Sequence, residues 1–439
     1  MPSAIRFCDL MEKKSAIPEF YKKTPAERLA LVKDFAGLSD EEAAMIQKTG
    51  ALELDSANRM IENVVGETQL PIGIATNFTI NGKDYLIPMA IEEPSVVAAA
   101  SNAARLARPA GGFTTSADEP VMIGQIQLVG VKDAEAGRKK ILAEKKNLLE
   151  FANSLDAPLV KFGGGARDLE VRAIDSIRGK MLVVHLLVDC RDAMGANAVN
   201  TMAENLAPKL EALTGGETRL RIISNLAVKR LARAKAVWTK EALKTEEFTG
   251  EKVIERVLDA YALADADPYR CATHNKGIMN GIDALVLATS NDWRAIEAGA
   301  HAYAAMGGKY KPLTKYYKNE KGDLVGEIEL PMAIGLIGGA TRTHPVAQVC
   351  VKILGVKTAK ELAEVCAAVG LAQNFAALRA LATVGIQKGH MALHARNIAV
   401  MAGAKGEMID VVAKRMADER KVRVDRAKEI LEELLGKKK

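Results

Sequence analysis

The chain of 439 residues has few aromatic residues and no long apolar run. Phe, Trp and Tyr together make up 4% of the sequence, which argues against an aromatic-rich binding face. No segment approaches 18 consecutive apolar residues, so we expect no membrane span. The first twenty residues include acidic side chains and lack an apolar core, and they do not resemble a signal peptide.

Cysteine is also scarce, with five residues in the whole chain. The number is odd, the spacings are wide, and no Cys-x-x-Cys pair occurs. This pattern excludes a disulfide framework and a cysteine zinc site, and it favours reduced thiols in a cytoplasmic protein. The cysteines are Cys8, Cys190, Cys271, Cys350 and Cys366.

The formal net charge of +6 is spread along the chain, apart from the lysines at 437–439. Nucleic-acid-binding proteins concentrate their basic residues on one face, so we expect no nucleic-acid partner. A mild positive excess suits an anionic substrate. The hydrophobic share of 49% and the length predict an ordinary globular protein of two or three domains.

The order of the predicted elements indicates an α+β protein. Helix signals occupy residues 24–65, and residues 78–87 predict a β-hairpin with Asn-Gly as its turn. A separate βαββαβ unit follows from about residue 120 to 227, and helices dominate after it. That order is ferredoxin-like rather than Rossmann-like, and no Gly-x-Gly-x-x-Gly occurs. The unit comprises strand 122–131, helix 139–151, strands 169–173 and 181–188, helix 193–213 and strand 218–223.

Two segments carry side chains suited to acid–base or anion chemistry. Glu93 precedes Pro94, which suits the first position of a helix, so its carboxyl group is expected at a helix entrance. Arg270 can bind a carboxylate through two hydrogen bonds, and Lys276 can stabilise an oxyanion. Each segment also has an interpretation without function. The adjacent acids at 92–93 would lie on a solvated surface, and Arg270 and Lys276 would be surface cations beside a capped loop.

Two further segments are open to more than one interpretation. His390 and His394 share one helix face, but the Glu of a His-Glu-x-x-His zinc site is missing, so we expect no metal. A proton-transfer or a structural histidine fits better. Residues 189–197 lie between an apolar strand and the start of a helix, where backbone N–H groups can bind a phosphate, or where Asp192 simply caps the helix.

Taken together, these segments resemble the class II branch of the 3-hydroxy-3-methylglutaryl-coenzyme A (HMG-CoA) reductases. The resemblance extends from Ile61 to the C-terminal helices, and no membrane anchor precedes it. The blocks that carry it are residues 61–66, 92–95 and 192–197, the segment around Lys276, residues 291–295, the glycine turn 335–339, and residues 389–391.

The resemblance implies an oxidoreductase that interconverts HMG-CoA with mevalonate and CoA through two hydride transfers. It implies a large, mostly helical substrate-binding domain made of residues 1–119 and 228–386. An inserted nicotinamide-binding domain would span residues 120–227, and a C-terminal helical flap residues 387–439. It also implies a homo-oligomer built from dimers, with each active site shared between two subunits.

The resemblance also assigns roles to individual residues. Lys276 would stabilise the carbonyl oxygen, Glu93 beside Asp292 would supply protons, and His390 would protonate the departing CoA thiolate. The catalytic set is Glu93, Lys276, Asp292 and His390. Ser95, Arg270 and Asn280 match HMG-binding positions. The cofactor-binding set is Asp156, Asp192, Met194, Gly195 and Asn197.

Two expectations concern ligand choice. Asp156 can accept hydrogen bonds from a ribose 2′-hydroxyl and would repel a 2′-phosphate, so we predict NADH (NAD) over NADPH (NADP). The alternative is that Asp156 only begins a turn before Pro158. Near the N-terminus, where relatives often have an arginine that contacts CoA, Lys22 or Lys23 would substitute.

Two rival functions remain. One is another CoA-thioester reductase with Cys271 as acyl nucleophile, although we find neither an activating base nor a Rossmann fingerprint for it. The other is a catalytically silent CoA- or nucleotide-binding regulator. That role predicts loss of the catalytic Glu, Lys, Asp or His, and all four are present.

Overall fold

The computed structural model describes residues 13–383 and 386–436. Its largest body is built on a mixed sheet of six strands in the order β2-β1-β3-β8-β10-β9. Neighbouring strands are antiparallel, except that β1 meets β3 in a short parallel pairing. The strands are β1 (Ile72–Ile80), β2 (Lys83–Ala90), β3 (Phe113–Ala117), β8 (Leu231–Trp238), β9 (Thr314–Lys318) and β10 (Leu324–Pro331).

The first two strands form the predicted hairpin. Ile80 pairs with Lys83 across the turn, and Thr79 pairs with Asp84. Asn81 and Gly82 both have positive φ angles, which matches the right-handed twist of the two strands. The hairpin prediction is therefore confirmed in its position and its turn.

Helices surround this sheet, and α15 runs through the middle of the domain. It packs against α11, α4, β8 and β3, and all of its central residues are buried. The helices of this domain are α1 (Pro25–Ala36), α2 (Asp40–Gln47), α3 (Leu54–Asn58), α4 (Val96–Ala107), α9 (Lys240–Leu243), α10 (Gly250–Ala266), α11 (Pro268–Ala288), α12 (Trp293–Ala305), α13 (Gly339–Thr343), α14 (Pro345–Leu354) and α15 (Ala359–Ala382).

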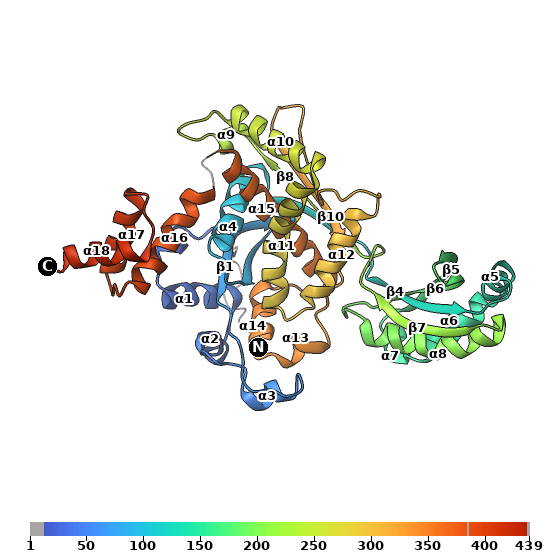
Figure 1. Ribbon diagram of the computed structural model, residues 1–439. Helices are drawn as coiled ribbons and strands as arrows, with labels where there is room; N and C mark the ends of the chain where they lie inside the picture. The colour runs from blue at the N-terminus through green and yellow to red at the C-terminus, as the bar shows by residue number, and fades with distance from the viewer. Residues whose placement is uncertain (1–12, 384–385, 437–439) are drawn as a thin grey trace, which may run out of the picture.

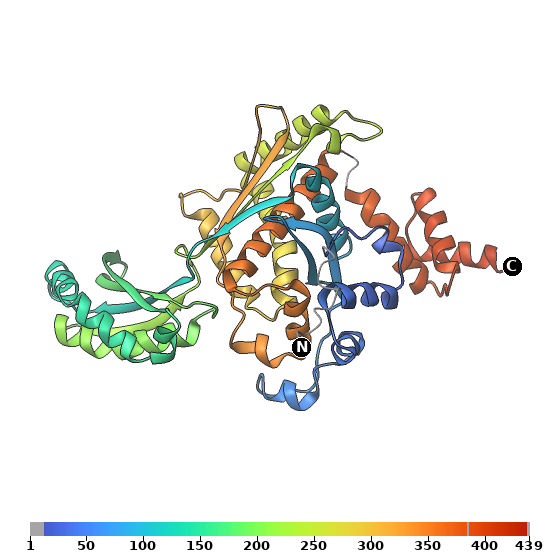
Figure 2. The ribbon, with the colours of Figure 1, turned by 180° about the vertical axis from the view of Figure 1, so that it is seen from behind.

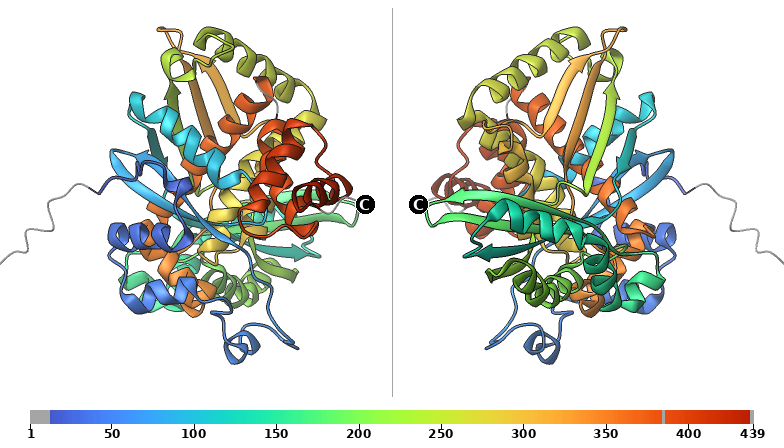
Figure 3. Two further views of the ribbon diagram at one scale, coloured as in Figure 1. Left: turned by 90° about the vertical axis from the view of Figure 1, so that its left-hand side faces the viewer. Right: turned by 90° about the vertical axis from the view of Figure 1, so that its right-hand side faces the viewer.

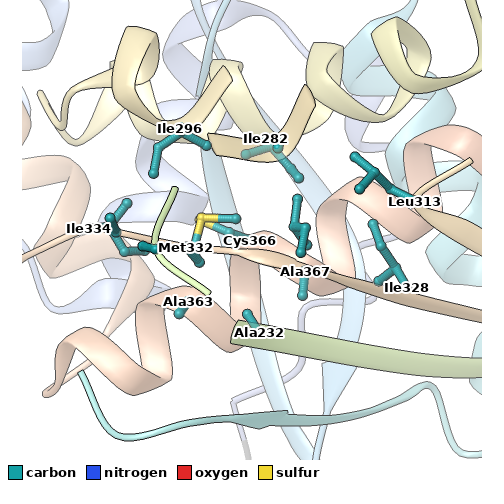
Figure 4. Packing of buried hydrophobic residues seen from close by; sticks show 14 of the residues in the cluster. Ala232, Ile282, Ile296, Leu313, Ile328, Met332, Ile334, Ala363, Cys366 and Ala367 are labelled. Carbon is teal, nitrogen blue, oxygen red and sulfur yellow. The ribbon is translucent and has the colours of Figure 1, made fainter. Parts of the chain in front are cut away.

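Apolar side chains from helices and strands meet in one continuous core (Figure 4). Ile282 of α11 and Ile296 of α12 face Cys366 and Ala367 of α15 across it. Four aromatic residues of this core, Phe78, Phe113, Trp238 and Phe375, form a series of ring contacts with centroids 3.8 to 6.4 Å apart. This core fixes α11, which carries several of the predicted site residues.

Helix α15 is long and apolar enough to cross a membrane by length and composition alone. However, 72% of its most apolar stretch is buried inside the protein. Burial on all sides accounts for its composition, as expected for the central helix of a large domain.

The segment between β3 and β8 forms a second, four-stranded antiparallel sheet in the order β5-β6-β4-β7. Its helices are α5 (Ala134–Ala143), α6 (Lys145–Ser154), α7 (Ala157–Lys161) and α8 (Ala196–Thr214), and its strands are β4 (Val121–Val129), β5 (Gly165–Ser176), β6 (Gly179–Asp189) and β7 (Glu217–Ser224). The single helix expected at 139–151 is two helices, which meet at Glu144. Both pack toward β5 and α8.

The last three helices form a separate cluster with its own small core. They are α16 (Ile386–Met401), α17 (Met408–Asp418) and α18 (Val424–Leu434). In Figures 1 and 2 this cluster and the four-stranded unit lie on opposite sides of the large domain, and Figure 3 looks along the line that joins them.

Candidate active site

Glu93, Lys276 and Asn280 come together on the surface of the large domain. Lys276 Nζ lies 2.8 Å from Glu93 Oε2, and the amide of Asn280 donates to the same oxygen at 3.4 Å. Lys276 and Asn280 are one turn apart on α11, so their side chains share one face of the helix. The two predicted catalytic residues and one predicted substrate contact therefore form a single cluster.

The local backbone explains how Glu93 reaches this position. The helix was expected to begin at Pro94, but α4 begins at Val96, and Ser95 precedes it with φ at +75°. A left-handed conformation is uncommon for a residue with a side chain and is often found at functional sites. It turns the chain between β2 and α4 so that Glu93 faces α11.

The cluster is open to solvent and carries opposite charges. The side chains of Lys276 and Glu93 are 59% and 35% exposed. An exposed pair of this kind contributes little to stability, so a structural role does not account for it well. An ammonium group beside a carboxyl group can stabilise an oxyanion and move a proton at one place, which is the chemistry that carbonyl reduction requires.

Arg270 lies in the first turn of α11, where Asp267 caps the helix by accepting the N–H of Arg270 at 3.0 Å. Partial burial lowers the pKa of its guanidinium, and it forms no ion pair with any residue that the structure describes. A partly desolvated, unpaired arginine beside the Lys276 segment is suited to bind the carboxylate of a substrate.

A second group of predicted residues lies at the junction of the two domains. The Asp192 carboxylate accepts the N–H of Ala359 at 2.8 Å, so together with the N-cap Thr358 it caps α15 rather than the helix that follows it. Its backbone carbonyl accepts the N–H groups of Leu336 and Ile337. This loop therefore joins the four-stranded unit to the glycine turn at 335–339.

Three residues that the sequence analysis missed or left without a role hold this junction together. The buried guanidinium of Arg230 donates to the carbonyls of Ala193, Met194 and Ile334. Asn291 accepts the N–H of Gly335 at 2.8 Å. A Cβ atom on Gly335 would lie 2.5 Å from the backbone nitrogen of Met194, so only glycine allows this contact. Arg230 lies just before β8, and a single arginine there gives no sequence signal of such a role.

Asp292 directly follows Asn291, which contacts Gly335 of this junction. It caps α12 by accepting the N–H of Ala295 at 3.1 Å, and Arg294 lies 3.3 Å from its carboxylate. The chain folds back so that Asn291 donates to the carbonyl of Val286. With 1.5 Å per helical residue, this places Asp292 about 15 Å along the α11 axis from Lys276. Within one chain, Asp292 and the Glu93–Lys276 cluster are therefore separate.

The start of α8 fits a phosphate group. Gly195 precedes this helix with φ at +103°, and a side chain there would clash with Cys190. No side chain caps the helix, so its first N–H groups remain free to bind an anion. Asn197 is exposed in the first turn, and Met194 lies in the loop just before it. These residues fit the phosphates of a dinucleotide.

Asp156 lies at the start of the short helix α7. Its Oδ1 accepts the N–H of Leu159 at 3.0 Å, so the turn-initiating role considered for this residue is present. The capping bond uses one carboxylate oxygen, and a carboxylate has lone pairs for further hydrogen bonds.

Two other predicted residues have different outcomes. The side chain of His390 lies outside the described residues, whereas His394, one turn later, is exposed. Cys271 is completely buried, and burial raises the pKa of its thiol to about 11. A buried thiol that stays protonated is a poor nucleophile, which argues against the acyl-cysteine alternative.

Near the N-terminus, a cavity of about 970 Å³ opens between residues 16–21, α1, β1 and α4. Lys22 pairs with Glu19 at 2.5 Å, whereas Lys23 caps the preceding turn through its backbone. Arg105 of α4 lines the cavity, is exposed, and forms no ion pair within residues 13–383 and 386–436. Arg28 holds the wall by donating to the carbonyls of Phe20 and Tyr21.

These features define a class of protein: a two-domain α+β oxidoreductase in which a carboxyl–ammonium pair on a helical domain accompanies a second domain suited to a dinucleotide. A family model for hydroxymethylglutaryl-coenzyme A reductase matches residues 24–395. The chain belongs to the HMG-CoA reductase family.

Individual relatives agree with this assignment. The HMG-CoA reductase of Archaeoglobus fulgidus is 62% identical over 420 residues, covering 96% of this chain and 95% of the relative. A probable HMG-CoA reductase of Borreliella burgdorferi is 39% identical over 343 residues and covers 77% of each chain.

Solved structures show the same fold. The HMG-CoA reductase of Streptococcus pneumoniae superposes with a TM-score of 0.81 at 42% identity, covering 94% of this chain and 99% of that one. A class II structure from the same organism, bound to NADPH in open conformations, gives 0.80 at 44% identity, covering 83% and 99%. The predicted class II fold is therefore confirmed.

Proposed function

We propose that this chain interconverts HMG-CoA and mevalonate plus CoA by two successive hydride transfers. The observation that carries the proposal is the cluster of Glu93, Lys276 and Asn280, which joins a proton donor, an oxyanion stabiliser and an amide at one point. The cofactor, when bound, supplies the hydride. Lys276 neutralises the negative charge that develops on the carbonyl oxygen, and Glu93 delivers the proton to that oxygen.

The test is the reaction in reverse. Purified enzyme given mevalonate and CoA should reduce a nicotinamide cofactor, and the rate should depend on both substrates. A silent regulator would show no turnover. A reductase with an acyl-cysteine intermediate would show a covalent adduct by mass spectrometry, which we do not expect because Cys271 is buried.

We further propose that two subunits share each active site. The two clusters that contain Lys276 and Asp292 lie about 15 Å apart along α11, at 1.5 Å per helical residue. A two-fold dimer would bring the Asp292 cluster of one subunit to the Glu93–Lys276 cluster of its partner. Dilution to a monomer should abolish turnover. A mixture of Lys276→Ala and Asp292→Ala subunits should recover part of it, because some mixed dimers contain one intact site.

Cofactor binding is proposed at the start of α8 together with Asp156. The uncapped N–H groups fit the diphosphate, and the free oxygen of Asp156 would accept the ribose 2′-hydroxyl. This arrangement favours NADH. We take the four-stranded unit to extend from about residue 120 to 227, a range that includes all five proposed cofactor-binding residues.

The CoA arm is proposed to occupy the cavity along α4. The cavity begins near the first turn of α4, directly after the Glu93–Ser95 turn, and reaches Arg105 about two turns later. Lys22 is paired with Glu19, so Arg105 is a better candidate to bind the phosphates than Lys22.

We also place the enzyme in the cytoplasm, because the four cysteines in the described chain are free and buried.

A further inference from the structure

A chain of polar side chains connects α11 to α12 and returns to α11. Asp283 of α11 is hydrogen-bonded to Glu297 of α12. His301 lies one turn further along α12, and its Nε2 atom is 2.7 Å from Glu297 Oε2. Its Nδ1 lies 2.7 Å from the hydroxyl of Tyr310, and the side chain of Asn275, again on α11, lies near that hydroxyl.

The proton positions in this chain follow from its polarity. Two carboxylates cannot share a hydrogen bond unless one of them is protonated. If Asp283 carries the proton, its O–H donates to Glu297, and the Nε2–H of His301 donates to Glu297 from the other side. The Tyr310 hydroxyl can then donate to Nδ1 of His301. The hydrogen bonds among these polar side chains are thus all directed toward one ionised group, the carboxylate of Glu297.

The surroundings of Asp283 favour its neutral form. Its Oδ1 is buried and has no hydrogen-bond partner among the described residues. The titratable groups beside it are Glu297 from α12 and Cys366 from α15. Burial, followed by the hydrogen bond and charge of Glu297, raises the pKa of Asp283 to about 9. The hydrogen bond from His301 lowers the pKa of Glu297.

Asp283 and Glu297 lie on the two helices that position Lys276 and Asp292. Lys276, Asn280 and Asp283 are spaced i, i+4 and i+7, so they lie on the same face of α11. Asn275, at the other end of the polar chain, is adjacent to Lys276 in sequence and fully buried. On α12, Glu297 lies five residues after Asp292. The polar chain therefore connects the helix that carries Lys276 with the helix that begins at Asp292.

We propose that Asp283 and Glu297 form a proton-sharing pair of positioning residues, which locks α12 onto α11 and thereby holds Asp292 in its working position for the reaction. This proposal rests on the proposed role of Asp292. A helix end displaced by about 1 Å can cost on the order of a hundredfold in rate, so a lock far from the reacting atoms has a measurable effect.

The test compares three single variants. Asp283→Asn keeps a neutral side chain that donates to Glu297, so its kcat should stay within about twofold of the wild type. Asp283→Leu and Glu297→Met break the bond with side chains of similar size, and each should lower kcat by about tenfold to a hundredfold with little change in KM. The kcat of the wild type should fall as pH rises through about 9, where Asp283 ionises, and Asp283→Asn should not show that fall. Circular dichroism and melting temperature establish that each variant is folded.

A second comparison asks whether the pair acts through Asp292. In an Asp292→Asn background, Asp283→Leu should cost much less than it costs in the wild type. An undiminished cost there, full activity of Asp283→Leu, or an Asp283→Asn variant as slow as Asp283→Leu would each overturn the proposal. The last result would mean that the proton itself, rather than the position of α12, is required. If Asp292→Asn alone retains full activity, the proposed role of Asp292 fails instead, which is a distinguishable result.

Discussion

Lys276 Nζ and Glu93 Oε2 lie 2.8 Å apart although 183 residues separate them in the sequence. The turn before α4 brings one residue to this contact, and the polar face of α11 brings the other. The pair is exposed and contributes little to folding, so its chemistry can be altered with little effect on the fold. This makes the site suitable for direct tests.

Lys276→Ala should lower kcat by about a hundredfold or more, because it removes the only cation in contact with Glu93 among the described residues. The melting temperature should change by no more than a few degrees, since the side chain is 59% exposed. Lys252→Ala, which alters an exposed lysine of α10, is the matched control and should retain full activity. Normal turnover in Lys276→Ala would refute the site assignment.

His390→Gln should impair the reduction of HMG-CoA more than the reduction of free mevaldehyde. Only the thioester releases a thiolate that needs a proton, and histidine titrates near neutral pH. The measurement is kcat with each substrate. His394→Gln, on the same face of α16, is the control. Equal losses for both substrates in His390→Gln would contradict this role.

Asp156→Ala should shift the ratio of kcat/KM for NADH over NADPH toward NADPH, because the carboxylate that repels a 2′-phosphate is removed. The wild type should prefer NADH. Asp133→Ala is a matched control, since Asp133 also caps a helix of the same domain, and it should leave the ratio unchanged. A wild type that prefers NADPH, or a ratio insensitive to Asp156→Ala, would exclude Asp156 from the cofactor site.

Arg105→Ala should raise KM for HMG-CoA several-fold and leave KM for mevaldehyde unchanged, because mevaldehyde lacks the CoA phosphates that the arginine is proposed to bind. The effect on HMG-CoA should weaken at high salt, where exposed charges are screened. Equal changes for both substrates would place Arg105 outside the CoA site.

The stability of the wild type should depend on pH through Asp283. In the unfolded chain this carboxyl group loses its proton near pH 4, whereas in the folded protein it keeps the proton up to about pH 9. Between these values the folded state binds one more proton, so its stability falls as pH rises. Asp283→Asn removes this dependence. Its unfolding free energy relative to the wild type, measured in urea, should increase from pH 5 to pH 9, and a constant difference would contradict the assignment.

The sequence by itself determined the local features. The Asn-Gly hairpin, the caps at Thr24 and Ser39, and the alternation of strands and helices in the second domain depend on neighbouring residues, so they can be predicted from spacing. The residues of the Glu93–Lys276 cluster were also found in the sequence, because their type and order resemble those of a known family. Asp283 was not, since a single acid inside an apolar helical run gives no signal of its partner.

Only the tertiary structure decided which residues meet. Whether Asp192 caps its own helix or α15, and whether Asp283 pairs with Glu297, depends on contacts between segments that are distant in the chain or lie on different helices. The separation of Asp292 from Lys276 likewise follows from the length of α11 and the direction of the turn after it. Such contacts are set by the packing of the core around α15, which no local pattern encodes.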